Sequence, residues 1–356
     1  MVKTGTGFSI GFAEETPYGT AASSISHNLD PRGGMESLQG EVDHIVPESL
    51  SFRGNDSAQF VAGMRRASGS VTHDLRFGGG WMMFLSHLTG HKYATTGVSS
   101  PYSHAIPLGM DLSTSDSQPQ SRGVTFLVDR EGDNAASSSK AWLYSGMKPT
   151  ACDFTFEQGS IANASWEFTG SDVATIARPA SVALATVPYI AHPSAGGGTL
   201  VKSVRFGVDG SEVGYDVRSM SLHLEQPVAE RRTIEGATPL VPVPGGNFIA
   251  SGSFEIEAPD NAVAGTFDVF TDLYRSAGTN SLLMTVEGAV ISGSTNHSLS
   301  FDFPKVRVTN VGEPQVADSG LILRTVEWEA AYSGVAATGV GSCTLVTSDT
   351  AGYTAA

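Results

Sequence analysis

Basic side chains are scarce in this chain of 356 residues: 21 Lys and Arg stand against 36 Asp and Glu, and the formal net charge is −15. A protein that holds duplex DNA needs a basic surface that displaces counterions from the phosphates. The acidic excess is spread evenly, with 11 basic and 18 acidic side chains in residues 1–175, and 10 and 18 in residues 176–356. The composition therefore argues against a protein that grips nucleic acid.

Long apolar runs and cysteines are scarce as well. The longest apolar run, residues 81–85, is too short to span a membrane. The N-terminal residues lack the basic stretch and apolar run of a signal peptide. The two cysteines, Cys152 and Cys343, have no metal-binding or redox spacing, so we expect two buried free thiols. We expect no membrane partner and no disulfide framework.

Patterns that would indicate catalysis are missing too. The nine histidines are dispersed and none lies in a metal-binding motif. The glycines at 78–80 precede an expected helix, but no Lys-Ser or Lys-Thr pair follows them to complete a phosphate loop. Neighbouring carboxylates such as Glu14 and Glu15 are far more often solvated surface groups than catalytic pairs. We therefore expect no enzyme, no catalytic residue, no cofactor and no metal.

The pattern that is present is that of short β-strands. At 40% hydrophobic and 16% charged residues the chain is too apolar for disorder, and its 41 glycines and 17 prolines indicate many turns. Only residues 79–89 and 263–275 have helical spacing, and each helix is expected to bury its apolar stripe against a β-sandwich. The Asp209-Gly210 pair is a hairpin signal. Apolar and polar residues alternate, as in half-buried strands, at 151–156, 164–170, 204–208, 218–224, 253–257, 298–303 and 324–330.

Short landmarks recur in the same order in the two halves of the chain. Four matches in register predict a tandem duplication with a boundary near residues 175–200. The fold class predicted is all-β, with two similar domains, each a small sheet pair or open barrel with one short helix. The matched segments are 48–52 with 218–222, 67–71 with 250–254, the helix around Phe84 with that around Phe270, and 166–168 with 326–328.

Two insertions, 53–66 and 225–249, occupy equivalent places in the halves, and each carries a pair of arginines beside apolar residues. A basic, apolar arm on an acidic body suggests a docking element for an acidic partner, such as a second copy of the chain. An ordinary surface hairpin is the alternative. The candidate interface residues are Phe60, Met64, Arg65, Arg66, Arg231, Arg232, Ile234, Leu240 and Val241, with Val61 and Val243 beside them.

Several segments resemble the tail tube proteins of long-tailed bacteriophages. The sharpest is residues 11–22, GFAEETPYGTAA, near the N-terminus. The expected strand at 48–52, the Gly69-Ser70-Val71 segment before a helix, the Pro-Tyr-Ser-His segment at 101–104 and the closing strands at 301–306 and 325–329 also fit the family. The resemblance covers residues 5–334 approximately, and the segment after 335 lies outside it.

The resemblance implies stacked rings around the channel through which the genome leaves the head. A two-domain chain would close a ring as a trimer with pseudo-sixfold symmetry, although six chains per ring would also close. Residues 53–66 and 225–249 would contact the neighbouring ring, and the N-terminal arm would contact it through Phe12, Glu14, Glu15 and Tyr18. The domains expected are an arm at 1–24, tail-tube-like domains at 25–175 and 200–334, a linker at 176–199 and an extension at 335–356 that is flexible or docks on the next ring.

The resemblance also implies a set of partners and a place. The chain would assemble in the host bacterial cytoplasm into the virion tail, with copies of itself, with tip and terminator proteins, and around a tape measure protein. Phage DNA would pass through the lumen without specific binding, which fits an acidic lining with the arginine pairs placed at ring contacts. The alternatives are a carbohydrate-binding β-sandwich with exposed Trp81, Trp142, Trp166 or Trp328, a tail terminator and a capsid decoration protein.

Overall fold

The computed structural model of the protein describes most of both halves of the chain. Within the described residues the chain is mostly antiparallel β-strand with a single α-helix. The described residues are 8–29, 31–45, 61–97, 99–109, 119–130, 140–177, 188–190, 202–207, 213–215, 217–233, 236, 238–257, 274, 280–313, 315–316, 322–334 and 339–349.

The first half contains the α-helix α1 (Met82–Thr89), a 3-10 turn η2 (Pro119–Ser121) and the first eleven strands. These strands are β1 (Ser9–Glu14), β2 (His27–Leu29), β3 (Pro31–Glu36), β4 (Gln39–Ile45), β5 (Val61–Asp74), β6 (Ala94–Thr96), β7 (Tyr102–Leu108), β8 (Val124–Asp129), β9 (Lys140–Glu157), β10 (Asn163–Gly170) and β11 (Asp172–Ala177).

The second half supplies the remaining strands. They are β12 (Lys202–Gly207), β13 (Val213–Tyr215), β14 (Val217–Glu225), β15 (Val228–Arg231), β16 (Leu240–Pro244), β17 (Ile249–Glu257), β18 (Asn280–Ser292), β19 (Thr295–Val311), β20 (Gln315–Val316), β21 (Ile322–Ala330) and β22 (Gly341–Thr347). The strands expected from alternation all occur, as β9, β10, β12, β14, β17, β19 and β21.

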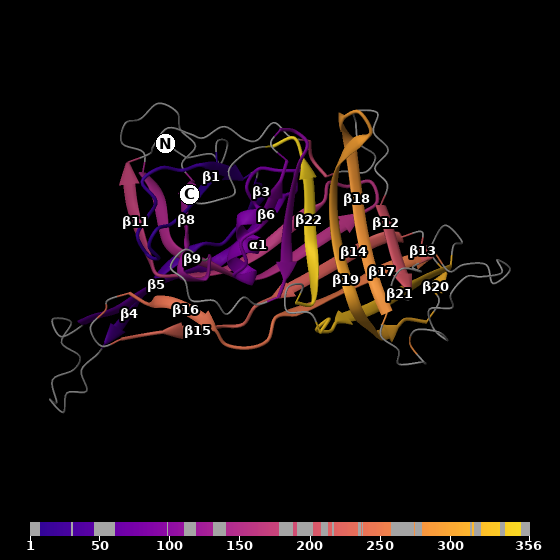
Figure 1. The fold of residues 1–356 in the computed structure, drawn as a ribbon. Coiled ribbons are helices and arrows are strands. Elements are labelled where there is room, and N and C mark those ends of the chain that lie inside the picture. The colour runs from indigo at the N-terminus through magenta and orange to yellow at the C-terminus, as the bar shows by residue number, and fades with distance from the viewer. Residues whose placement is uncertain are drawn as a thin grey trace.

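One sheet runs through both halves without a break. Its strand order is β4–β5–β10–β9–β14–β17–β21–β19, with every neighbouring pair antiparallel. The join between the halves is the β9–β14 pair, and Figure 1 shows these strands running along the lower part of the molecule. We call this sheet the shared sheet. The two halves are thus joined by backbone pairing as well as by side-chain packing.

Strands from both halves form a second layer that covers one face of the shared sheet. In the first half, β2, β1, β8 and β11 extend from the bent strand β9. In the second half, β13, β12 and β18 pair in turn and join β19. A single apolar core runs between the layers and across the halves, where the rings of Phe154 and Phe301 lie 5.3 Å apart.

Helix α1 lies within this core, and all of its residues are buried. It ends at Gly90, whose φ of 78° is a left-handed conformation that glycine adopts without strain. The sequence expectation of a helix at 79–89 is confirmed for residues 82–89, and its burial agrees with the plugging role. The helix expected at 263–275 and the strand expected at 48–52 lie outside the described residues, apart from Tyr274.

The two halves share their strand registers. Adding 183 to the β5 numbers and 160 to the β10 numbers reproduces the pairing of β17 with β21. The matched pairs are Val71–Trp166 and Gly69–Phe168 in the first half, and Phe254–Val326 and Gly252–Trp328 in the second.

The irregularities of the pairing recur too. Strand β9 skips Thr150 where it passes β10, and β19 skips Thr309 where it passes β21. A bulge is a specific local distortion of a strand pair, so its repetition at one register is a strong structural match. The pairs beside the bulges are Glu167–Ala151 and Phe168–Pro149, and Glu327–Asn310 and Trp328–Val308.

A hydrogen-bonded pair of serines also recurs in the two halves. Ser37 and Ser70 share a hydrogen bond between their hydroxyls at 2.9 Å, and so do Ser221 and Ser253, also at 2.9 Å. Ser70 and Ser253 are the equivalent positions of β5 and β17. By register, therefore, residues 218–222 of β14 correspond to residues 34–38. Residues 48–52, which the sequence comparison paired with 218–222, lie outside the described residues.

Both ends of the described chain lie within the fold. Residues 9–14, expected in an N-terminal arm, form β1 and pair with β2 and β8. Residues 341–347, expected in an extension, form β22, which pairs with β19 of the second half and with β7 of the first. In Figure 1 the yellow strand β22 stands between the two groups of strands. It is a second backbone link between the halves.

Candidate functional site

The solvent face of the shared sheet is an extensive polar feature of the described residues. Residues directly opposite one another in paired strands point to the same face, so the registers define this face strand by strand. It carries mainly serine, threonine and acidic side chains. Its acidic members are Glu41, Asp153, Glu157, Glu167, Glu225, Glu255, Glu257, Glu327 and Glu329. We call it the acidic face.

Two arginines of the acidic face each lie beside a carboxylate. Arg66 Nη2 lies 2.6 Å from Glu41 Oε2. Arg307 lies directly opposite Glu329 in the β19–β21 pair. Neighbouring carboxylates therefore compensate these charges, and the face keeps a net negative charge across both halves.

His223 is the titratable group at the join of the halves. Its Nδ1 lies 2.7 Å from Asp153 Oδ1 on β9, and its Nε2 lies 3.4 Å from Glu225 Oε2. Partial burial opposes protonation, but the hydrogen bond and charge of Asp153, with those of Glu225, outweigh it and raise the pKa of His223. The acidic residues of the face thus favour a positive charge on this imidazole.

The two arginines of the first insertion point to opposite sides of β5. Arg66 lies on the acidic face, whereas Arg65 lies on the other side, 3.5 Å from Asp172 Oδ2 at the start of β11. Met64 is half-buried beside them, and Phe60 lies outside the described residues. Alternation along a strand separates neighbours in this way, so an Arg-Arg pair on a strand cannot act as one patch.

The second insertion folds as a two-stranded ribbon, β15–β16. Arg232 binds Glu230 at 2.7 Å and reaches Asp43 at the end of β4 at 3.5 Å, while Arg231 is exposed. Figure 1 shows the ribbon and β4 extending to the same side of the molecule. The ribbon and the end of β4 are therefore adjacent in space.

Apolar side chains are exposed on these two projections. The exposed fraction is 42% for Val42 on β4, 40% for Leu240 and 39% for Val243 on β16. Val241 is half-buried, and Ile234 lies outside the described residues. A pocket of about 670 Å³ adjoins the residues that flank the ribbon and is lined in part by Phe248 and Tyr332. This side of the molecule combines apolar surface with charge, as protein interfaces do.

The N-terminal candidates serve the interior of the first half. Phe12 is fully buried and packs on Phe84 of α1 with ring centroids 4.6 Å apart. Glu15 is fully buried and accepts hydrogen bonds from Thr125 and from the backbone of Gly19 and Gly146. Burial raises the pKa of Glu15, although these hydrogen bonds oppose the increase. Burial also raises the pKa of Tyr18, and the negative charge of Glu15 adds to this effect. Phe12 and Glu15 are thus inaccessible to another ring.

Glu14 belongs to a buried polar cluster with His87, Arg122 and Lys148. Arg122 lies 3.2 Å from Glu14, and His87 Nε2 lies 3.4 Å from it. Although burial opposes ionisation of Glu14, His87 and Arg122 lower its pKa. Lys148 donates to the carbonyls of Pro119 and Arg122, and burial lowers its pKa to about 7 against the charge of Glu14. The cluster fixes η2 against α1 and β9.

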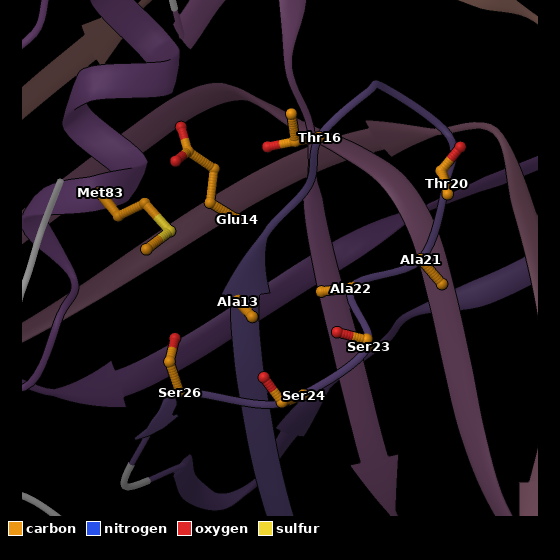
Figure 2. Close-up of a pocket in the computed structure, with 10 residues that line it drawn as sticks. All are labelled: Ala13, Glu14, Thr16, Thr20, Ala21, Ala22, Ser23, Ser24, Ser26 and Met83. Atoms are coloured by element: carbon orange, nitrogen blue, oxygen red, sulfur yellow. The ribbon is translucent and has the colours of Figure 1, made fainter. Parts of the chain in front are cut away.

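A pocket of about 520 Å³ opens beside this cluster. Figure 2 shows its walls: the loop after β1 with Thr16 and residues 20–24, then Ser26, with Met83 of α1 across from the loop. Its lining is small and rich in hydroxyls, and Glu14 is its one charged member.

In the described part of the chain, His, Cys, Asp and Glu residues form no group of three that could hold a metal ion. None of the helices described has the length and apolarity needed to cross a membrane. The tryptophans considered for sugar stacking are not exposed: Trp81, Trp166 and Trp328 are buried, and Trp142 is half-buried against the core.

The buried free cysteines expected from the sequence are confirmed. The registers that define the acidic face could not be read from the sequence, although its alternating Ser, Thr and Glu residues were visible there.

Comparison with known families gives a match between residues 7–330 and the model of a family described as phage tail tube protein. No curated protein matches the chain.

Proposed function

The chain belongs to the phage tail tube protein family, and we propose that it forms closed rings that stack with the acidic face turned toward the channel. The family's role is structural and not enzymatic: its members polymerise into the tube of the virion tail. The observation that carries the proposal is the acidic face, which runs through both halves as one sheet.

We infer a tandem duplication from the repeated registers and bulges. A random pair of β domains has no reason to repeat a bulge at one register, whereas copies of one ancestral domain do. Two equivalent domains per chain favour a ring of three chains with pseudo-sixfold symmetry. The boundary near residues 175–200 falls between β11 and β12, so the proposed domains are 25–175 and 200–334, with β1 and β22 added to them.

An acidic lining suits a channel through which DNA moves. Carboxylates repel phosphate and offer it no hydrogen-bond donor, while unpaired arginines would hold it through charge-assisted bonds. In this arrangement Arg66 lies on the channel face with its charge compensated by Glu41. The expectation that both arginines of the first pair lie at ring contacts is therefore kept for Arg65 alone.

We assign ring stacking to the projections of the two halves. The ribbon β15–β16 and the β4–β5 hairpin extend to one side and present exposed Val42, Leu240 and Val243 with Arg231 and Arg232. Phe60 and Ile234 belong to the same insertions. The apolar side chains would be buried against the acidic body of the next ring, and the arginines would pair with its carboxylates.

The remaining partners rest on the family alone. We propose tip and terminator proteins at the two ends of the tube, a tape measure protein in the lumen, passage of phage DNA without specific binding, and assembly in the host bacterial cytoplasm. Glycan binding is not proposed, because the described tryptophans are packed in the interior.

Negative-stain electron microscopy of the purified protein over a range of concentrations tests the proposal. We expect hollow tubes or rings with three dominant subunits and six density lobes around the axis. Rings of six chains would overturn the trimer but retain the tube. A protein that forms no ring at any concentration, even after a tail tip complex is added as nucleus, would overturn the ring proposal.

A further inference from the structure

The join inside the chain is a strand seam with a defined register. Strand β14 pairs with β9 so that Glu225 lies opposite Ala151 and His223 opposite Asp153. The Gln226 N–H donates to the Thr150 carbonyl at 2.9 Å, which makes 226–150 a hydrogen-bonded pair. The pairs 225–151 and 223–153 are therefore non-hydrogen-bonded pairs, in which side chains lie closest.

The two strands of this seam have counterparts at the opposite ends of the shared sheet. By register, β14 corresponds to residues 33–41 at the β3–β4 end of the sheet, and β9 corresponds to β19. In the described part of the chain, β4 pairs on one edge only, with β5. Beyond Val306, β19 likewise pairs on one edge only, with β21. The two edges of the shared sheet thus carry the counterparts of the two strands that pair in the internal seam.

We propose that residues 39–42 of one copy pair antiparallel with residues 309–312 of the next, in the register of the internal seam. This inference rests on the proposed ring assembly and names its contact. Subtracting 184 from a β14 residue number gives its counterpart at the β3–β4 end, and adding 159 to a β9 number gives its counterpart in β19. The internal pairs 225–151 and 223–153 therefore predict that Glu41 lies opposite Asn310 and Gln39 opposite Gly312. The Val42 N–H then donates to the Thr309 carbonyl, as Gln226 does to Thr150. The partner is a second copy of this chain.

The side chains at the two edges fit such a contact. Val42 is 42% exposed although it lies on the core side of β4, whereas its counterpart Gln226 is 3% exposed inside the internal seam. Val311 is half-buried on the core side of β19, where it would lie diagonally from Val42. Pairing the copies would cover both valines and continue the core across the ring.

Charge permits the same register. Glu41 is compensated by Arg66, and Asn310, opposite it, is neutral. No two like charges therefore meet in the pairs 41–310 and 39–312. A register shifted by two residues would instead place Glu41 opposite Gly312 and Gln39 opposite residue 314. That register would no longer correspond to the pairing of β14 with β9 in the internal seam.

The neighbouring backbone sets where pairing begins. The Leu38 N–H donates to Glu36 Oε1 at 2.7 Å, and the Leu38 carbonyl accepts from Tyr144 at 2.8 Å and from Arg130 at 2.6 Å. These groups are occupied within the chain, so the edge available to a second copy starts at Gln39. Protection of part of an edge strand is a known means of limiting unwanted pairing.

Engineered cysteines test this register. Glu41→Cys and Asn310→Cys occupy a non-hydrogen-bonded pair, where the Cβ separation suits a disulfide. The native Cys152 and Cys343 are buried, and burial raises the pKa of both thiols, which keeps them unreactive. In assembled rings, mild oxidation of the double variant should link chains into closed species of three.

Matched variants separate register from proximity. Ser37→Cys with Asn310→Cys is four residues out of register and should link at least about tenfold less. A mixture of the single variants Glu41→Cys and Asn310→Cys should give dimers only. Glu225→Cys with Ala151→Cys, across the internal seam, should form its disulfide within one chain and serves as the positive control.

The outcomes distinguish the seam from the ring. Rings that form while only the internal control links would overturn the seam and leave the ring proposal standing. Equal linking of the in-register and out-of-register pairs would also overturn the register. Failure of all variants and of the parent to form rings would count against the ring proposal itself.

Discussion

At the scale of single residues, Lys148 makes the stability of the fold depend on pH. Its ammonium group is buried among Pro119, Arg122 and Glu14, and its pKa falls from 10.5 to about 7. Between these values the unfolded chain binds a proton that the folded chain does not, so the free energy of unfolding rises with pH. Above pH 9, the buried thiols Cys152 and Cys343 oppose this rise, because only the unfolded chain ionises them.

We therefore expect the urea midpoint to increase from pH 7 to about pH 9, and the variant Lys148→Met to show a flatter profile over that range. Equilibrium unfolding followed by tryptophan fluorescence measures both profiles. An exposed lysine, Lys92→Met, is the control and should leave the profile of the parent unchanged. Parallel profiles for Lys148→Met and the parent would mean that Lys148 keeps an ordinary pKa in the fold.

At the scale of elements, the β15–β16 ribbon is held to the first half by few contacts. Arg232 reaches Asp43, and exposed ion pairs of this kind contribute little to stability. Arg231→Glu with Arg232→Glu should thus leave the melting temperature nearly unchanged while it weakens ring stacking. We expect the protein concentration needed for tube formation to rise at least about tenfold, which corresponds to about 1.4 kcal/mol.

Sedimentation across a concentration series measures that threshold, with electron microscopy of the pellet to identify tubes. Lys92→Glu changes the charge of an exposed lysine that belongs neither to the ribbon nor to the β4–β5 hairpin, and it serves as the control. Polymerisation of the double variant at the concentration of the parent would contradict a stacking role for the ribbon.

At the scale of the whole molecule, β22 joins the halves. Cys343 and Leu345 are fully buried, and the strand covers edges of both β7 and β19. Burial of each apolar side chain is worth about 1.5–3 kcal/mol, a large part of a total stability of about 5–15 kcal/mol. A chain ending after Val340 should therefore lose its single cooperative transition, whereas one ending after Asp349, which keeps β22, should retain it.

Differential scanning calorimetry measures the transitions of both truncated chains. Independent unfolding of the two halves in the full-length protein, seen as two separate transitions, would contradict a fold held together by β9–β14 and β22.

The sequence predicted the strands well because alternation follows directly from burial on one face. Trp166 and Phe168 alternate with Ser165 and Glu167, and they lie where expected in β10. The sequence could not reveal that Arg65 and Arg66 face opposite sides or that Phe12 is buried, because both depend on which strands become neighbours. Nor could it reveal that residues 34–38 share the register of 218–222, which the Ser37–Ser70 and Ser221–Ser253 pairs show.

The position of β22 has a consequence for the time at which the protein matures. Strand β7 belongs to the first third of the chain, but its partner arrives only when residues 341–347 have been synthesised. During translation the first half therefore waits with an open edge, and long-range pairing of this kind is slow. The fold is completed only after residues 341–347 have been synthesised, which delays association between nascent chains on one messenger.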